Sequence, residues 1–336
     1  MRVCSYNVEW FDDLFEGNDL SFSGEKKENR LRIEAIGQVL REIDADIYGI
    51  VEAPNTIIED EKESTIIKLE KFLEFVNLSN YSVYFDKISA GRQELALLYK
   101  KDSVIVESYC GGKKDSKENP RFIDDFIFDT DDDKVKELYK LYRPPLEARI
   151  IDKKTNYEFY IFLCHTKSKG IFNSVDILHW EKENIRNRRK LIAECSWIRR
   201  HILELLENEK DVLVLGDFND GPGMDSFEFE FGKSAIELVM GDIYDAKNIL
   251  VNAINKPEWD NYGWKPASTS FKDTITGKYV NVLIDHILFS QKMNNYKISS
   301  MVWNPYQYKD NALLSNIVFS LKTASDHFPV SVDFNF

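Results

Sequence analysis

The stretch "DVLVLGDFND", residues 211–220, carries the local signal from which the fold can be worked out. Val212 to Leu215 form an unbroken apolar run, the pattern of a strand buried on both faces. Gly216, Asp217, Phe218 and Asn219 follow, and these types also favour a turn. The stretch alone therefore leaves two alternatives, a plain turn or a functional strand end. In an extended chain Asp217 and Asn219 would share one face and Phe218 would point to the core, with turn residues only at 220–222.

Other apolar runs end in polar residues in the same way. These residues are Asn7 in "CSYNVEW", Glu52 in "IYGIVEAPN", His165 in "YIFLCHTKSKG", Asp285 and His286 in "VNVLIDHILF", and Asp326 and His327 in "TASDHFPVSV". Singly, each has a structural interpretation, such as a backbone-bonded strand end or a solvated exit. A buried Asp285 would need a partner, because an unpaired buried carboxylate is costly. Together they supply the parts of a metal site with acid–base groups.

The residue types indicate which chemistry this site would serve. Carboxylate and amide oxygens suit a hard cation, so we expect Mg²⁺, with Mn²⁺ or Ca²⁺ as alternatives. No cluster of Cys or closely spaced His indicates structural zinc. A His paired with an Asp is held in one tautomer and can move protons near neutral pH.

The order of apolar patterns predicts strands and long helices in alternation. Strands are predicted at Arg2–Val8, Ile47–Val51, Tyr81–Phe85, Glu94–Tyr99, Val104–Ser108, Leu146–Ile151, Glu158–Cys164, Val280–Phe289, Lys297–Trp303 and Phe328–Phe334, and helices at Glu28–Ile43, Ser64–Val76 and Trp180–Leu206. This order suggests two packed sheets covered by helices. No linker divides the chain, so we expect one domain, 1–336. Residues 111–142, rich in Lys and Asp, are predicted to be a charged, solvated loop or insertion, since no EF-hand spacing favours a calcium site.

Composition narrows the class of protein. The formal net charge is −13, which argues mildly against a non-specific nucleic-acid binder but leaves room for local basic patches. Four cysteines lack metal-type spacing and are interpreted as buried free thiols in preference to disulfides. The basic run on the predicted long helix, Arg186 to Arg200, is interpreted as a solvated face. No stretch has the length of a membrane helix and no signal peptide begins the sequence, so we expect a cytoplasmic protein unless a leader was trimmed. We also expect a monomer.

The motifs, taken in order, resemble the endonuclease/exonuclease/phosphatase superfamily, and DNase-like bacterial nucleases in particular. They are "SYNVEW", "GIVEAPN", "YRPPLEARI", "CHTKSKG", "LGDFNDGPG", "LIDHILFS" and "SDHFPV", and they span nearly the whole chain. "GDFND" and "SDHFPV" occurring together are highly specific. The resemblance implies an α/β (α+β) fold, a four-layer α/β/β/α sandwich of two mixed, mostly antiparallel sheets flanked by helices.

The resemblance also implies roles for single residues. Glu52, Asn7 and Asp326 match the metal-binding positions. Asp217 matches the Asp that orients or deprotonates water, Asn219 the Asn that holds the scissile phosphate, His327 the catalytic His and Asp285 the Asp that orients it. His165 matches a His that contacts the phosphate, with Glu94 as its suggested partner, and Arg143 matches an Arg near the phosphate cleft. Lys167 and Lys169 are expected either to meet phosphate or to be an ordinary solvated pair on a loop.

The expected function is therefore divalent-metal-dependent hydrolysis of a phosphodiester, with DNA as the substrate of an endonuclease or exonuclease. Two alternatives stay open. One is a phosphoinositide phosphatase or sphingomyelinase-like esterase, and the other is a catalytically silent binding domain.

Overall fold

Two six-stranded sheets form the centre of the molecule. The computed structural model describes residues 1–336 except 22–26, 57–63, 172–175, 222–223, 256–265, 273–276 and 308–313. The first sheet has the order β17 (Lys297–Val302), β18 (Val330–Phe334), β1 (Arg2–Asn7), β4 (Ile47–Ala53), β6 (Glu94–Lys100), β5 (Tyr81–Tyr84). The second has the order β13 (Leu250–Asn252), β16 (Asp285–Ser290), β12 (Val212–Asp217), β11 (Glu158–His165), β10 (Leu146–Asp152), β7 (Val104–Ser108).

Only the β1–β4 and β11–β12 pairs are parallel within these two sheets. All other pairs in them are antiparallel. The predicted mixed, mostly antiparallel sheets are therefore confirmed.

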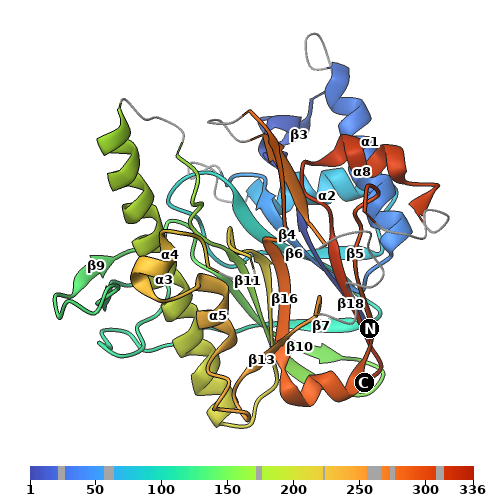
Figure 1. Ribbon diagram of the computed structural model, residues 1–336. Helices are drawn as coiled ribbons and strands as arrows, with labels where there is room; N and C mark the ends of the chain where they lie inside the picture. The colour runs from blue at the N-terminus through green and yellow to red at the C-terminus, as the bar shows by residue number, and fades with distance from the viewer. Residues whose placement is uncertain are drawn as a thin grey trace.

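Helices cover the outer faces of both sheets (Figure 1). One layer contains α1 (Lys27–Ile43), α2 (Ser64–Phe75) and α8 (Val318–Ala324), and the other contains α3 (Ile177–Glu207), α4 (Glu228–Phe231) and α5 (Ala235–Met240). Smaller elements are the 3₁₀ helices η1 (Phe11–Leu14) and η3 (Gln291–Tyr296) and the hairpins β2–β3 (Phe15–Glu16, Asp19–Leu20), β8–β9 (Phe126–Phe128, Glu137–Tyr139) and β14–β15 (Thr269–Lys272, Tyr279–Val282). The four-layer sandwich is confirmed. Among the helices described, none combines the length and apolarity that a bilayer crossing needs.

The β12 strand shows why the sheets stack. Leu213 and Leu215 lie in the core between the sheets, while Val214 and Phe218 lie in the core under α3. Both faces are buried, as the unbroken apolar run predicts. The sheets approach closely at Gly49 of β4, where a Cβ atom would come within 2.7 Å of a Leu163 methyl group.

Three local predictions are wrong. The predicted strand Val280–Phe289 is two strands, because Ser268 Oγ accepts hydrogen bonds from the backbone N–H groups of Ile284 (3.1 Å) and Asp285 (3.0 Å) where the chain changes sheet. All four cysteines are free thiols, as predicted, but Cys110 is exposed while the other three are buried. The basic face of α3 is only partly solvated, since Arg188 is buried against Asp225.

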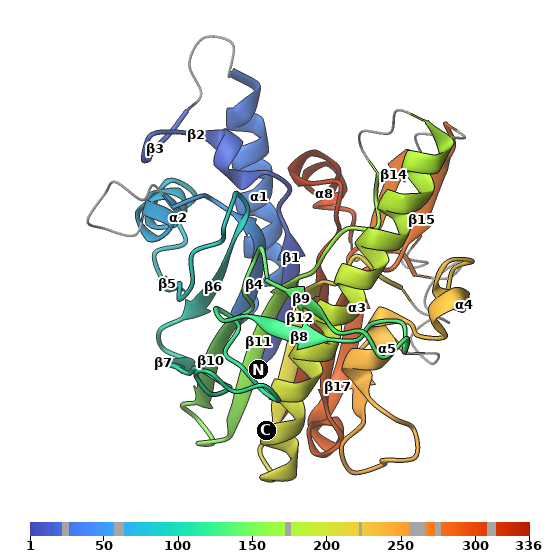
Figure 2. The same cartoon turned by 90° about the vertical axis from the view of Figure 1, so that its left-hand side faces the viewer.

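The charged segment 111–142 is also more ordered than a solvated loop. It contains the β8–β9 hairpin, which lies against α3 (Figure 2). Phe122 and Phe126 are buried, and Phe122 stacks on His201 at 3.8 Å. Glu147 anchors the start of the segment by accepting a 3.0 Å hydrogen bond from Gly111 N. Burial alone would raise the pKa of Glu147, but His201 and Lys87 outweigh it and hold that pKa below its ordinary value.

Candidate active site

Strand register brings the predicted site residues to one edge of the two sheets. His165, the last residue of β11, is paired with Asp217, the last of β12, and Asp217 is paired with Asp285, the first of β16. Asn7 ends β1 in the facing sheet, beside Val51 of β4. Its amide Nδ2 donates across the sandwich to Asp217 Oδ2 at 3.0 Å, so the two sheets are joined at the site.

Glu52 is placed by a backbone irregularity. The β4–β6 register shifts between Val51 and Ala53, and Glu52 has φ +60°, a conformation that costs energy outside glycine. The carboxylate is held by three donors: Trp10 N at 2.8 Å and Gln93 Nε2 at 2.7 Å to Oε2, and Asn7 Nδ2 at 3.4 Å to Oε1. The strained backbone therefore fixes a buried carboxylate at the sheet edge.

Asp217 is buried and faces both sheets. Burial raises its pKa, and the negative charge of Asp285 raises it further. The preceding Gly216 has φ +135°, and a Cβ atom there would lie 1.9 Å from Cys164 O, so only glycine fits. Asn219 N donates to Asp217 Oδ1 at 2.8 Å and Asn219 Nδ2 donates to Thr166 O at 3.0 Å. Asn219 has φ +49°, so the two residues meet through a turn and not, as predicted, through extended spacing.

A turn was predicted at residues 220–222, but its first residue, Asp220, is a buried hydrogen-bonding group. Pro222 lies outside the described residues. Asp220 is buried and accepts hydrogen bonds from Ile236 N at 2.8 Å and Ser234 Oγ at 3.2 Å. Its carboxylate also pairs with Lys169, which contacts Glu228 as well. Lys169 is therefore held in an internal ion-pair cluster and does not face the site as expected.

His327 and Asp285 form a close pair. His327 Nδ1 lies 2.8 Å from Asp285 Oδ2, so this nitrogen is assigned as the donor. The other ring nitrogen, Nε2, lies 3.8 Å from Asp326 Oδ1 and 4.0 Å from Asp217 Oδ2. Burial lowers the pKa of His327, but the carboxylates of Asp285, Asp217 and Asp326 outweigh burial and raise it to about 10. The imidazole is therefore protonated at neutral pH.

His165 lies opposite this pair. Its Nε2 is 3.8 Å from Asp217 Oδ2 and 4.0 Å from Glu52 Oε1, at the limit of ion-pair contact. Burial, and then the charges of Arg143 and His327, lower the pKa of His165 well below its ordinary value, so the ring is neutral at pH 7. The suggested partner is wrong: Nδ1 has no hydrogen-bond partner among the described residues, and Glu94 Oε2 accepts from Ser89 N at 2.8 Å.

Gln93 is the residue that the sequence reasoning missed. It donates to Glu52, as described above, and its Oε1 accepts from Arg143 NH1 at 2.7 Å. Arg143 also donates to the backbone oxygens of His165 and Thr166, both at 3.2 Å. Gln93 directly precedes the suggested Glu94 in "GRQEL". Gln93 thus links the carboxylate side of the site to its cationic side.

The cationic side is a pocket of about 240 Å³ beside His165. Arg143, Lys167, Lys190, Tyr142 and Glu194 complete its lining. Lys167 N donates to Glu194 Oε2 at 2.7 Å, which directs the loop after β11 along this pocket. Arg143 and Lys167 thus line one pocket with His165, and their contact with phosphate stays a prediction.

On the side of the site around Glu52, the carboxylates of Glu9, Glu52 and Asp326 lie near one cation, Arg32. Burial raises the pKa of Glu9, and the charges of Asp326 and Glu52 raise it further against the effect of Arg32. These oxygens fit a hard divalent cation, which would relieve their mutual repulsion. Asp217, Asp285 and His327 also bring three ligand atoms within 4.8 Å of one another. We prefer the Glu52 side for a cation, because the His327–Asp285 contact already uses a proton.

Comparison with known proteins bears on the fold. No family model and no curated protein matches the chain. Among solved structures, a mannosyl-6-phosphatase from Bacteroides thetaiotaomicron is 15% identical, with all of both chains covered and a TM-score of 0.53. An endonuclease/exonuclease/phosphatase family protein from the same species is 14% identical over 100% of this chain and 98% of that one, with a TM-score of 0.53.

A third similar structure is the 3′-5′ exonuclease from Neisseria meningitidis, 13% identical over all of both chains, with a TM-score of 0.51. At these identities the likeness shows the fold alone. The chain has the DNase I-like fold of endonuclease/exonuclease/phosphatase proteins, and the predicted fold is confirmed.

Proposed function

We propose that the chain is a divalent-metal-dependent phosphodiester hydrolase that acts on nucleic acid, with DNA as its substrate. One observation carries the proposal. A His–Asp pair at 2.8 Å, a buried carboxylate with a raised pKa and a second, neutral His converge at one sheet edge. This is the set of groups that in-line attack of water on a phosphate needs.

Asn7, Glu52 and Asp326 would hold the cation, and the carboxylate excess around Glu9 supports a cation there. When bound, Mg²⁺ supplies positive charge that offsets the charge growing on the phosphate in the transition state. The backbone strain at Glu52 supports a positional role for this residue, because such strain persists only where the surrounding structure enforces it.

The chain's own groups divide the proton work between them. Asp217 is the better base, because its raised pKa brings it nearer to neutral pH, where a base is most effective. His327 is already protonated, so it would donate a hydrogen bond from Nε2 to the phosphate while Asp285 fixes its ring. Neutral His165 would donate a hydrogen bond to a phosphate oxygen and not act as an acid, since it holds no extra proton. Asn219 and Arg143 would bind the remaining oxygens.

Shared fold does not choose the substrate, since the similar structures include both an exonuclease and a sugar phosphatase. The pocket beside His165, called the phosphate pocket from here on, favours a diester chain, because its cations extend beyond His165 to Lys167 and Lys190. A phosphomonoester or a phosphoinositide remains the competing substrate class, and the activity test includes both.

The test is nicking of a supercoiled plasmid with Mg²⁺, with Mn²⁺ and with EDTA, beside a panel of inositol phosphates and sugar phosphates. We expect nicking that EDTA abolishes, and loss of roughly a thousandfold or more in Asp217→Asn and His327→Ala. Asp102→Asn changes an exposed residue in the turn after β6, at the end of that strand remote from the site, and serves as the matched control. Nicking that survives the site variants, or turnover of sugar phosphates alone, would contradict the proposal.

A further inference from the structure

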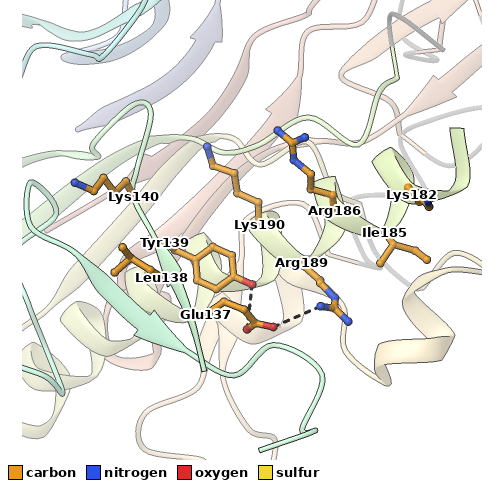
Figure 3. A pocket seen from close by; sticks show the side chains of 9 residues that line it. All are labelled: Glu137, Leu138, Tyr139, Lys140, Lys182, Ile185, Arg186, Arg189 and Lys190. Carbon is orange, nitrogen blue, oxygen red and sulfur yellow. Dashed lines mark hydrogen bonds and ion pairs between the residues drawn. The ribbon is translucent and has the colours of Figure 1, made fainter. Parts of the chain in front are cut away.

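A second recess lies beside the proposed active site and not in it. We call it the hairpin groove, a cavity of about 630 Å³ between the end of the β8–β9 hairpin and the amino-terminal half of α3. Its charged lining residues are Glu137, Lys140, Lys182, Arg186, Arg189 and Lys190. Figure 3 shows Lys140, Lys190 and Arg186 spread along one side of the groove in that view. Five cations against one carboxylate is unexpected in a chain of net charge −13.

Two of these cations have structural partners. Arg189 pairs with Asp131 and lies 3.4 Å from Glu137 Oε1, which fastens the hairpin to α3. Lys190 Nζ lies 3.8 Å from Glu194 Oε1. These contacts hold Arg189 and Lys190 in fixed positions, so this side of the groove is an ordered part of the fold.

The other three cations are available to a ligand. Lys140 and Arg186 make only exposed ion pairs, with Asp125 and Glu183, and exposed pairs contribute little. Lys182 is exposed and forms no ion pair with any residue that the structure describes. These three side chains lie at intervals along the groove and do not converge on one point (Figure 3). Such spacing suits a row of phosphates better than a single anion.

The hairpin groove adjoins the pocket beside His165, because Lys190 lines both. Lys190 Nζ also lies 5.8 Å from the ring centroid of Tyr142, an exposed aromatic of the phosphate pocket. Burial lowers the pKa of Lys167, and the nearby charges of Lys190, Arg143 and Arg186 lower it further, so the cations of both recesses act on one another.

We propose that the hairpin groove binds the sugar–phosphate backbone of a single-stranded segment of the substrate, beyond the phosphate held at His165. Lys140, Lys182 and Arg186 would contact successive phosphates, and the apolar surfaces of Leu138 and Ile185 with the exposed ring of Tyr142 would contact bases. Cations beside an aromatic platform are the usual means of binding single strands without sequence preference. The inference rests on the proposed nucleic-acid function and specifies how the substrate is held.

The test measures binding and needs no turnover. A fluorescein-labelled 20-nucleotide oligothymidylate is titrated in EDTA with the wild-type chain and with the triple variant Lys140→Ala, Lys182→Ala, Arg186→Ala, at several salt concentrations. We expect the triple variant to bind at least about tenfold more weakly. The slope of log K against log salt should become shallower by about 2, since each lost contact to a single strand accounts for roughly 0.7.

A charge-matched control separates the groove from the loss of total charge. Lys101, Lys154 and Lys210 are exposed and lie at the opposite ends of β6, β10 and β12 from the site, so their triple alanine variant removes the same charge elsewhere. The control should bind as the wild type does, and thermal unfolding should show that both variants fold. Equal affinity of the groove variant and the wild type, or equal loss in the control, would overturn the inference.

Further arms distinguish the inference from its alternatives. If the chain binds phosphoinositide vesicles more tightly than the oligonucleotide, and the groove variant loses that binding, the groove binds a membrane surface. That result would overturn the proposal that the groove binds a single strand. Binding of the 20-mer through the groove without any phosphodiester hydrolysis would refute the proposed function and leave this inference standing. Phosphodiester hydrolysis without any contribution of the groove to binding would support the proposed function and overturn this inference.

Discussion

Replacing Asp285 by asparagine removes one negative charge and keeps the shape of the side chain. Asp285 is 1% exposed, so it cannot touch a substrate and acts only through His327, whose Nδ1 lies 2.8 Å from Oδ2. Three carboxylates raise the pKa of His327 from 6.5 to about 10, which corresponds to ~5 kcal/mol in favour of the imidazolium ion. Asp285 contributes more than Asp217 or Asp326 to that rise.

If Asp285 supplies about half of this energy, its loss removes ~2–3 kcal/mol from any transition state that the imidazolium stabilises. That is a fall in kcat of roughly 30- to 150-fold. KM should change little, because Asp285 is a positioning residue without substrate contact. The pKa of His327 should fall toward its ordinary value, which a metal-free NMR titration of the ring would measure.

The assay is multiple-turnover cleavage of a fluorescent oligonucleotide, with Asp102→Asn as the exposed control. Thermal unfolding within a few degrees of the wild type would show that the variant is folded. The reasoning fails if kcat stays within about threefold of the wild type while the His327 pKa falls. It fails equally if the pKa does not move.

Three further predictions concern the frame of the site. Gly216→Ala should destabilise the chain by ~3 kcal/mol or more in urea unfolding, because its Cβ would meet a backbone oxygen, whereas Gly17→Ala, at φ +59° with open space around it, should cost only ~1 kcal/mol. The pKa of Glu147 is lowered on folding, so its ionised form stabilises the fold above about pH 4.3, and that stability is lost as the pH falls through the folded pKa. Glu147→Gln should therefore flatten the acid side of the stability curve, and an unchanged acid side would contradict this. Gln93→Ala should raise the Mg²⁺ concentration for half-maximal activity by roughly tenfold, and Arg92→Ala, an exposed neighbour, should not; equal effects would show that Gln93 does not position Glu52.

Much of the fold is readable in the sequence because it depends on local periodicity. The apolar run Val212–Leu215 identifies a strand buried on both faces. The structure confirms it, since the side chains of β12 pack into the two different cores on either side of the sheet. The helix predicted at Trp180–Leu206 is α3, three residues longer at its start. The strand predicted at Val280–Phe289 failed because apolar continuity does not show where a chain changes sheet. That change depends on Ser268, which is distant in sequence from the break.

For the candidate site, too, the sequence identifies some features and the tertiary structure decides the others. Residue type and position at a strand end single out Asn7, Glu52, His165, Asp217 and Asp285, because a polar residue after an apolar run is visible in the sequence itself. Only the tertiary structure decides their partners. Gln93, which precedes β6 and has φ +75°, contacts Glu52, whereas Glu94, the first residue of β6, accepts from Ser89 N and does not pair with His165.

By itself, the sequence determined most of the strands, the expectation of two packed sheets and the inventory of reactive groups, since periodicity and residue type are local properties. The structure alone decided the protonation of His327 and His165, the enclosure of Asp220 and Lys169, and the hairpin groove. Each of these depends on distances between residues tens to hundreds of positions apart. Burial and charge at a point in space are set by how the sheets, the β8–β9 hairpin and α3 come together, and no local pattern encodes that arrangement.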